Sequence, residues 1–169
     1  MLSKENYIKR IAKDIFRAQN RGGKGVIGVT TKEEDEIKTI LYAKNHDQIL
    51  YFTNFGRVFV LPVYEIIEAN RNAKGQAIVN LLKLKIDEKV SSMLLVPDGG
   101  FKKACLIIAT THGTIKKTAI EAYKNLRQNG LISIKLKEGD QLHWVKEVAK
   151  NEEIIMVTKN GKCIRFPES

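Results

Sequence analysis

Three strand–turn–strand patterns recur along this chain, and their spacing limits the fold more than any other feature. Each joins two short apolar runs, rich in β-branched residues, through a glycine-containing turn, at 49–61, 106–117 and 154–166. Such runs are typical of β-hairpins, and the Asn160-Gly161 pair is the clearest turn signal among them. The threonine before each turn stands at position 53, 110 or 158, in steps of 57 and 48 residues. The hairpins are therefore predicted to be copies of one unit.

Two further markers share this spacing. A glycine precedes a short apolar run three times, and an acidic residue stands two places before an apolar residue three times. The glycines are Gly25, Gly75 and Gly130, and the acidic residues are Asp35, Glu88 and Asp140. A period of about 50 residues with about four strands per unit is typical of propeller blades. We therefore predict an all-β, propeller-like (β-pinwheel) fold of four-stranded antiparallel blades.

The repeat divides the chain into roughly three units within one partial domain, residues 1–169. Approximate blades are expected at 5–56, 57–113 and 114–169. Residues 7–10 match the second strand of a hairpin, so the first unit is expected to lack its opening strand. The stretches 63–69 and 119–123 are expected to be irregular or briefly helical, because neither is long enough for a stable helix.

Charge points to a polyanionic partner. The net charge is +10, and residues 1–25 hold seven Lys or Arg against Glu5 and Asp14, a local balance of +5. Half of the excess charge thus lies in about a seventh of the chain. Nucleic acid is the first candidate partner and an anionic membrane the second, while the plain alternative is a basic protein without such a partner.

The heptad Gln19-Asn20-Arg21-Gly22-Gly23-Lys24-Gly25 is the densest part of this basic region. Glycines allow positive φ angles, so the turn can direct several N–H groups to one side as an anion-binding nest. Arg21 and Lys24 add two charges, and a guanidinium can bind phosphate with two hydrogen bonds. The heptad is predicted to contact phosphate. The alternative is a mobile glycine loop with solvated charges.

Weaker versions of this basic cluster follow in the later units. Blades arranged around an axis would bring them to one rim, which suits a bent duplex held by its phosphates. The further candidates for DNA contact are Lys9, Arg10, Lys13, Arg17, Arg57, Arg71, Lys74, Lys116, Lys117, Lys124, Arg127, Lys162 and Arg165.

No motif for catalysis or metal binding accompanies these residues. His46, His112 and His143 have no Cys or carboxylate at ligand spacing, and the glycine loop lacks the Lys-Ser/Thr ending of a P-loop. Cys105 and Cys163 are expected to be small buried hydrophobes, since neither forms a CxxC pair. No catalytic residue, metal or cofactor is predicted. Without a signal peptide or an apolar span, a cytoplasmic location is expected.

Several segments, in chain order, resemble the C-terminal domain of the DNA gyrase A subunit. They are 7–10, 19–25, 52–58, 64–66, 70–75, 80–84, 88–90, 113–117 and 139–140. The heptad is similar to the gyrase A box, Gln-Arg-Arg-Gly-Gly-Lys-Gly, in six of seven positions, and Asn20 is the departure. A box this complete separates gyrase from its paralogue topoisomerase IV.

The resemblance implies a β-pinwheel of about six blades that wraps double-stranded DNA around its basic rim with a positive crossing. It implies partners in the B subunit of gyrase and in the rest of the gyrase A protein, within an A2B2 enzyme associated with the bacterial nucleoid. The resemblance places the cleavage tyrosine, magnesium and ATP in other parts of that enzyme. We therefore expect a DNA-wrapping module that is not an enzyme by itself and needs no cofactor.

Three alternatives remain open. One is a propeller that serves as a scaffold for protein interactions, another is an enzyme with a site in a central channel, and the third is the corresponding domain of topoisomerase IV. Because about three of six blades are expected, the partial disc is also expected to self-associate through its exposed strand edges. No contact with a membrane is expected.

Overall fold

The computed structural model describes residues 1–16, 20–23, 25, 35–98, 100, 105–124, 126 and 129–168. Within these residues every regular element is a β-strand or a short 3-10 turn. The strands are β1 (Leu2–Ser3), β2 (Tyr7–Ile8), β3 (Ile37–Thr39), β4 (Gln48–Thr53), β5 (Arg57–Pro62), β6 (Gln76–Ala77), β7 (Val90–Val96), β8 (Cys105–Thr110), β9 (Ile115–Ala119), β10 (Leu131–Ile132), β11 (Leu142–Val148), β12 (Glu153–Val157) and β13 (Cys163–Pro167). The 3-10 turns are η1 (Lys13–Ile15), η2 (Val63–Glu65), η3 (Ile78–Asn80) and η4 (Ile120–Tyr123).

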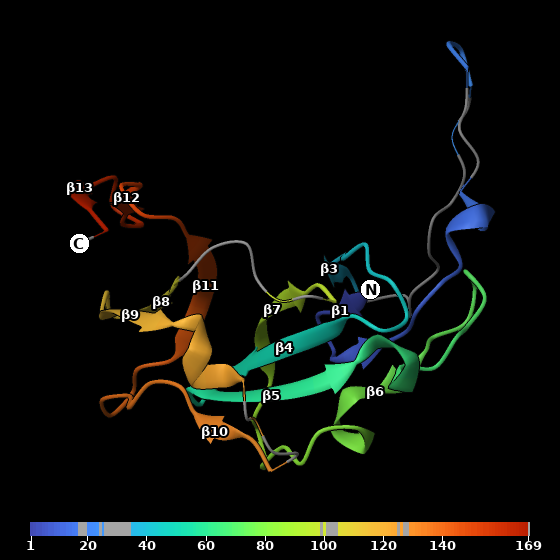
Figure 1. Cartoon of the computed structure of the whole chain (residues 1–169), viewed down its shortest axis with the longest axis horizontal. Helices are drawn as coiled ribbons and strands as arrows, with labels where there is room; N and C mark the ends of the chain where they lie inside the picture. The colour runs from blue at the N-terminus through green and yellow to red at the C-terminus, as the bar shows by residue number, and fades with distance from the viewer. Residues whose placement is uncertain are drawn as a thin grey trace.

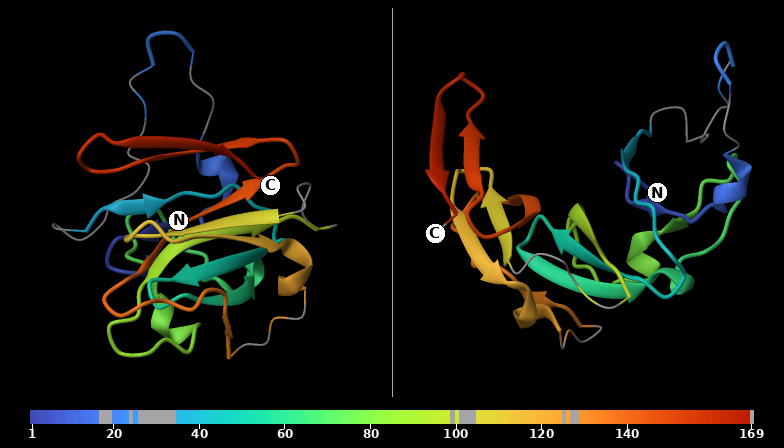
Figure 2. Two further views of the ribbon diagram at one scale, coloured as in Figure 1. Left: turned by 90° about the vertical axis from the view of Figure 1, so that its left-hand side faces the viewer. Right: turned by 45° about the horizontal axis from the view of Figure 1, so that its top comes forward.

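Four antiparallel sheets follow one another along the chain. Their strand orders are β3-β1-β2-β6, β10-β5-β4-β7, β11-β8-β9 and β12-β13. The sheets are arranged along a curved arc, with the first sheet and the β12–β13 hairpin at opposite ends (Figures 1 and 2). The predicted all-β, propeller-like class is confirmed.

Neighbouring units exchange strands. β6 pairs with β2 (Tyr7 opposite Ala77), and β10 pairs with β5 (Leu131 opposite Val58). Each of these two hairpins therefore receives its outer strand from the unit that follows it in sequence. The strands predicted after Gly75 and Gly130 thus exist, but each lasts only two residues.

The first unit corrects one expectation. Residues 7–10 were expected to lack a partner strand, yet β1 pairs antiparallel with β2, with Leu2 opposite Ile8. Repeat spacing alone missed β1 because it is only two residues long. The expected unit boundaries after 56 and after 113 fall in the turns between β4 and β5 and between β8 and β9. The β4–β5 and β8–β9 hairpins therefore each span one of these boundaries.

The core lies between successive sheets. β4 is buried on both faces, so its alternate side chains enter two different clusters: Ile49 and Tyr51 pack with Phe59 toward the first sheet. Leu50 and Phe52 pack toward β8 and η4, where the ring of Phe52 meets that of Tyr123 edge-on at 5.9 Å. This alternation with period two joins three sheets through one strand.

Each hairpin turn is closed in the same way by a hydroxyl group. The backbone N–H four residues later donates to it, at 3.1 Å for Ser3, 3.3 Å for Thr53, 3.0 Å for Thr110 and 3.1 Å for Thr158. The threonine marker therefore has a structural cause, and Ser3 is its fourth copy.

The acidic marker also has a structural cause. Asp35, Glu88 and Asp140 are buried, and each accepts hydrogen bonds from the hairpin turn that precedes it in the chain. The donors are the N–H of Glu5, the hydroxyl of Thr53, and the hydroxyl of Thr111 with the N–H of His112. Burial opposes ionisation of Asp140, but these and neighbouring hydrogen bonds prevail and lower the pKa of its carboxyl below the usual range.

Two local expectations have different outcomes. The stretches 63–69 and 119–123 contain only the short turns η2 and η4, as expected. Cys105 is partly buried, but Cys163 is exposed, so the expectation of a buried Cys163 was wrong. β12 and β13 form a sheet of two strands, and this hairpin leaves Cys163 uncovered within the described residues.

Gly75 permits the close approach of the exchanged strand. Its φ is +85°, and a Cβ there would lie 2.5 Å from the carbonyl oxygen of Ile8 and 3.0 Å from the Cβ of Lys9. Gly113 has a similar φ of +83° but no atom within 4 Å of the same position. A side chain at either glycine would therefore strain the backbone, but only at Gly75 would it also collide with neighbouring atoms.

We expect Gly75→Ala to destabilise the fold more than Gly113→Ala. Both changes introduce strain at positive φ, but only the first forces backbone apart, which costs about 1–3 kcal/mol in addition. Urea unfolding of the two variants and the unchanged chain measures the difference. Equal losses for both glycines would show that β6 does not depend on this contact.

Candidate nucleic-acid interface

The turn at 20–23 lies well away from the sheets (Figure 1). The N–H of Gly23 donates to the carbonyl of Asn20 at 3.0 Å, while Gly22 and Gly25 adopt φ of +88° and +70°. All four residues of the turn and Gly25 are exposed. Two of the three glycines therefore use the positive φ that the sequence predicted, and the turn presents Arg21 to solvent.

Some predicted contacts lie outside the described residues. They are Arg17, Gln19, Lys24 and Arg127.

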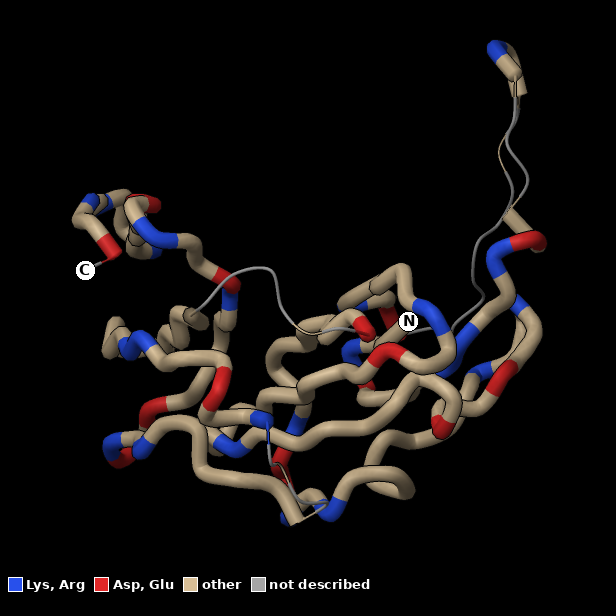
Figure 3. The backbone as a smooth tube through the Cα atoms, viewed as in Figure 1, with Lys and Arg blue, Asp and Glu red and all other residues tan. Residues whose placement is uncertain are grey.

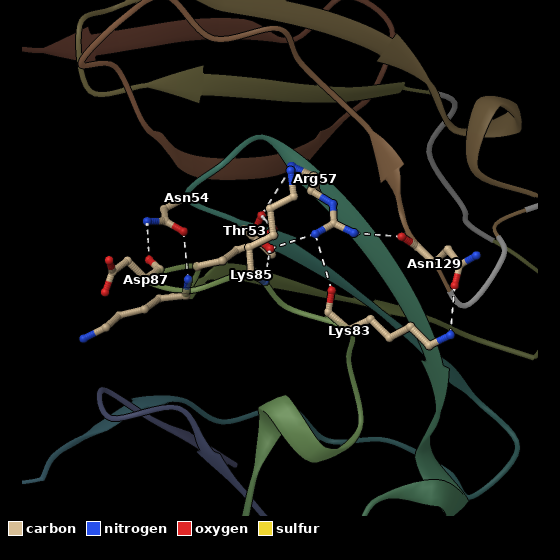
Figure 4. A network of polar contacts seen from close by, with 9 residues as sticks. Thr53, Asn54, Arg57, Lys83, Lys85, Asp87 and Asn129 are labelled. Atoms are coloured by element: carbon tan, nitrogen blue, oxygen red, sulfur yellow. Dashed lines mark hydrogen bonds and ion pairs between the residues drawn. The ribbon is translucent and has the colours of Figure 1, made fainter.

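Arg57 is held inside a polar network (Figure 4). Its guanidinium contacts the Glu88 carboxylate at 2.8 Å, and these side chains are 17% and 0% exposed. It also donates to the carbonyl of Asn129 at 2.8 Å and stacks over the ring of Phe59 at 4.6 Å. The oxygens of Glu88 accept further hydrogen bonds from Thr53 and from the N–H of Lys85. Arg57 therefore joins its own hairpin to the next unit, which leaves little of its charge for a phosphate.

Lys9 and Arg10 are also engaged. Lys9 is 4% exposed, and its ammonium donates to the carbonyls of Arg71 and Ala73. Burial lowers the pKa of Lys9. Arg10 pairs with Glu68 at 3.0 Å and donates to the carbonyl of Ile66. A contact between Lys9 and DNA stays a prediction, while the structure shows the ammonium bound to carbonyls of the chain itself.

Three other predicted residues have partners on the protein. The ammonium of Lys117 contacts Glu168, Arg165 lies 3.3 Å from Glu153, and Lys116 donates to the carbonyl of Ser133 at 2.7 Å. All three are exposed. The Arg165–Glu153 pair is exposed on both sides, and such pairs are weak, so Arg165 remains able to exchange its carboxylate for a phosphate.

The remaining predicted residues are exposed or partly exposed. Arg71 is partly exposed, and the residues in the exposed class are Lys13, Lys74, Lys124 and Lys162. Lys13 also lies 5.5 Å from the centre of the Tyr42 ring. Lysines and arginines occur on every sheet, with acidic residues between them (Figure 3). The basic charge is thus spread along the arc.

Two lysines that the sequence did not single out bind groups far away in the chain. Lys83 donates to the side chain of Asn129 at 3.2 Å, and Lys38 donates to the carbonyl of Val90 at 2.8 Å. Burial lowers the pKa of Lys38, with a smaller contribution from Lys89. These partners are 46 and 52 residues apart, so no local pattern could have indicated them.

Other kinds of site find no support in the part of the chain that the structure describes. No group of three or more His, Cys, Asp or Glu there is placed to hold a metal ion. None of its helices is long and apolar enough to cross a membrane.

Comparison with known proteins identifies the family. The model of the DNA gyrase C-terminal domain, a β-propeller, matches residues 1–44, 47–97, 106–149 and 152–169. The chain belongs to this family. Three of the four matched stretches begin at or just before a hairpin, and the stretch 106–149 begins one residue inside β8.

Individual relatives agree with this assignment. The chain is 41% identical to the DNA gyrase A subunit of Staphylococcus aureus (strain NCTC 8325 / PS 47) and 43% identical to that of Streptococcus pyogenes serotype M1. Each alignment covers 99% of the chain, but only 19% and 20% of the relative. The chain thus spans about a fifth of the gyrase proteins it matches.

Two solved structures share the fold of this gyrase-family domain. The C-terminal domain of DNA topoisomerase IV superposes with a TM-score of 0.79 at 29% identity. The DNA gyrase A C-terminal domain superposes with a TM-score of 0.72 at 27% identity. Each comparison covers 99% of the chain, and 50% and 53% of the solved domain.

We expect Glu88→Gln to destabilise the fold far more than Glu68→Gln. Both changes remove a carboxylate that pairs with an arginine, but Glu88 is fully buried, whereas the Glu68 side chain is 57% exposed. Breaking a buried pair costs about 3–5 kcal/mol, and an exposed pair contributes less than about 1 kcal/mol. Thermal and urea unfolding of both variants measure the difference. Similar losses would show that the Arg57 network is not what joins the two units.

Proposed function

We propose that this chain binds double-stranded DNA through its phosphates, without reading base sequence, and that it bends and wraps the duplex for negative supercoiling by DNA gyrase. The observation that carries the proposal is the exposed glycine turn at 20–23, which contains Arg21, in a chain of the gyrase C-terminal domain family. A basic turn that projects from the fold can reach a phosphate backbone without disturbing the sheets.

The distribution of charge supports the same proposal. The chain carries a net charge of +10, and its exposed lysines and arginines occur on successive units of a curved arc (Figure 3). Phosphates attract such charges whatever the base sequence. The described elements are strands and 3-10 turns, so this part of the chain offers no α-helix for reading bases in the major groove.

The proposed partners are double-stranded DNA, the B subunit of gyrase and the rest of the gyrase A protein in an A2B2 enzyme, all within the bacterial cytoplasm. DNA cleavage and ATP use are assigned to those other parts, so the proposed role of the chain is not catalytic and needs no cofactor. That the chain forms a partial disc of about three blades, and that this disc self-associates, both stay predictions.

A role in topoisomerase IV is the second candidate. The observation in its favour is the TM-score of 0.79 with the C-terminal domain of that enzyme. The gyrase assignment is preferred because 41–43% identity to gyrase A proteins extends over 99% of the chain. The six matching positions of the box heptad point the same way.

We expect DNA binding to weaken steeply with salt. If about five phosphates are neutralised, affinity falls on the order of 10²–10³-fold between 50 and 200 mM salt, because bound counterions are released. Fluorescence anisotropy with labelled duplexes of random and fixed sequence measures both the slope and the selectivity. A flat salt response, or strong preference for one sequence, contradicts the proposal. Absence of binding at low salt favours the protein-interaction scaffold instead.

A further inference from the structure

A second turn in the chain is similar to the box turn. Residues 70–75, Asn-Arg-Asn-Ala-Lys-Gly, share four of six positions with 20–25, Asn-Arg-Gly-Gly-Lys-Gly, at a distance of 50 residues. The N–H of Ala73 donates to the carbonyl of Asn70 at 3.1 Å, as Gly23 does to Asn20 at 3.0 Å. The closing glycine has positive φ in both, +85° at Gly75 and +70° at Gly25. At the third position of the turn, Gly22 has a positive φ and Asn72 does not. The two turns are therefore similar but not identical.

Lys9 lies beneath this second turn. Its ammonium donates to the carbonyl oxygens of Asn70 at 3.4 Å, Arg71 at 2.7 Å and Ala73 at 2.5 Å. The stem of Lys9 lies against the same turn, because a Cβ on Gly75 would be only 3.0 Å from that of Lys9. An ammonium has three donors and no acceptor, so one side chain from β2's end holds three carbonyls of one turn.

The direction of these carbonyls decides what the turn presents to solvent. In a trans peptide, the N–H of the next residue points opposite to the carbonyl. The carbonyl of Ala73 faces Lys9, so the N–H of Lys74 points away from Lys9. Lys9 also neutralises carbonyl dipoles that would repel a phosphate if they turned outward. The exposed Lys74 and partly exposed Arg71 are thus held on a turn whose negative ends are directed inward.

We propose that Lys9 is a positioning residue, which holds the 70–75 turn so that Arg71 and Lys74 act together as a second phosphate-contacting turn. The inference rests on the proposed function, since it assumes that the chain binds DNA. In this proposal Lys9 does not contact DNA directly. The residue is only 4% exposed, and its ammonium acts on the duplex through the 70–75 turn.

The test compares three variants of the chain by the salt dependence of binding to a random-sequence duplex. Lys9→Met keeps the length of the side chain and removes its donors. Lys13→Met is the matched control, because Lys13 is an exposed lysine of the same region. The double variant, Arg71→Gln with Lys74→Gln, removes the charges of the turn and leaves Lys9 in place. It still tests the role of the turn if Lys9→Met folds poorly.

Each lost phosphate contact reduces the slope of log affinity against log salt by about 0.9. We expect a reduction of about 1.8 for Lys9→Met, which removes one charge but two contacts, and the same for the double glutamine variant. Lys13→Met should lose at most about 0.9. In a fourth variant, which combines Lys9→Met with the two glutamine changes, the slope should be the same as in the double variant. Loss of stability alone would not produce this result.

The outcomes separate this inference from the proposed function. A steep slope for the unchanged chain, with Lys9→Met equal to Lys13→Met, overturns the inference and leaves the function standing. A double glutamine variant with an unchanged slope does the same, as does an additive effect of Lys9→Met on top of it. An unchanged chain without affinity for DNA at low salt overturns both.

Discussion

The structure depends on a buried carboxylate that recurs in each complete unit. Asp35, Glu88 and Asp140 each accept hydrogen bonds from the hairpin turn that precedes them in the chain. A serine or threonine hydroxyl closes each of these turns. A buried charge is stable only when it is paired or hydrogen-bonded. These hydrogen bonds hold the strand that follows each acidic residue against the hairpin turn. Arg57 extends this network, because it binds both the Glu88 carboxylate and the carbonyl of Asn129.

This arrangement divides the basic residues into two groups. Lys9, Arg10 and Arg57 hold backbone carbonyls or carboxylates and join segments that are far apart in sequence. Arg21 and Lys74 are exposed on turns that end in a glycine of positive φ. The total of 29 Lys and Arg therefore overstates the number of groups available to DNA, and the slope of binding against salt should reflect the second group.

Much of the fold could be predicted because its markers are local and repeated. The threonine, the glycine and the acidic residue each recur with a period of about 50 residues, and each has a structural cause in the sheets. β1 was missed because two residues give no periodic signal, and Cys163 was misplaced because apolar flanks do not show whether a second sheet covers a hairpin. The roles of Lys9 and Arg57 could not be predicted, since the carbonyls of Arg71 and Asn129 that they bind lie 62 and 72 residues away.

The central claim, that the chain wraps DNA in one direction, is tested most directly by ligating nicked circular DNA with the chain bound and then measuring linking number after the protein is removed. The account predicts a positive shift that grows with the amount of chain bound. It also predicts a smaller shift for a variant with alanine at residues 19–25, because the box turn is replaced while the sheets remain. A linking number equal to that of protein-free circles, at concentrations where the chain is bound, would contradict the account.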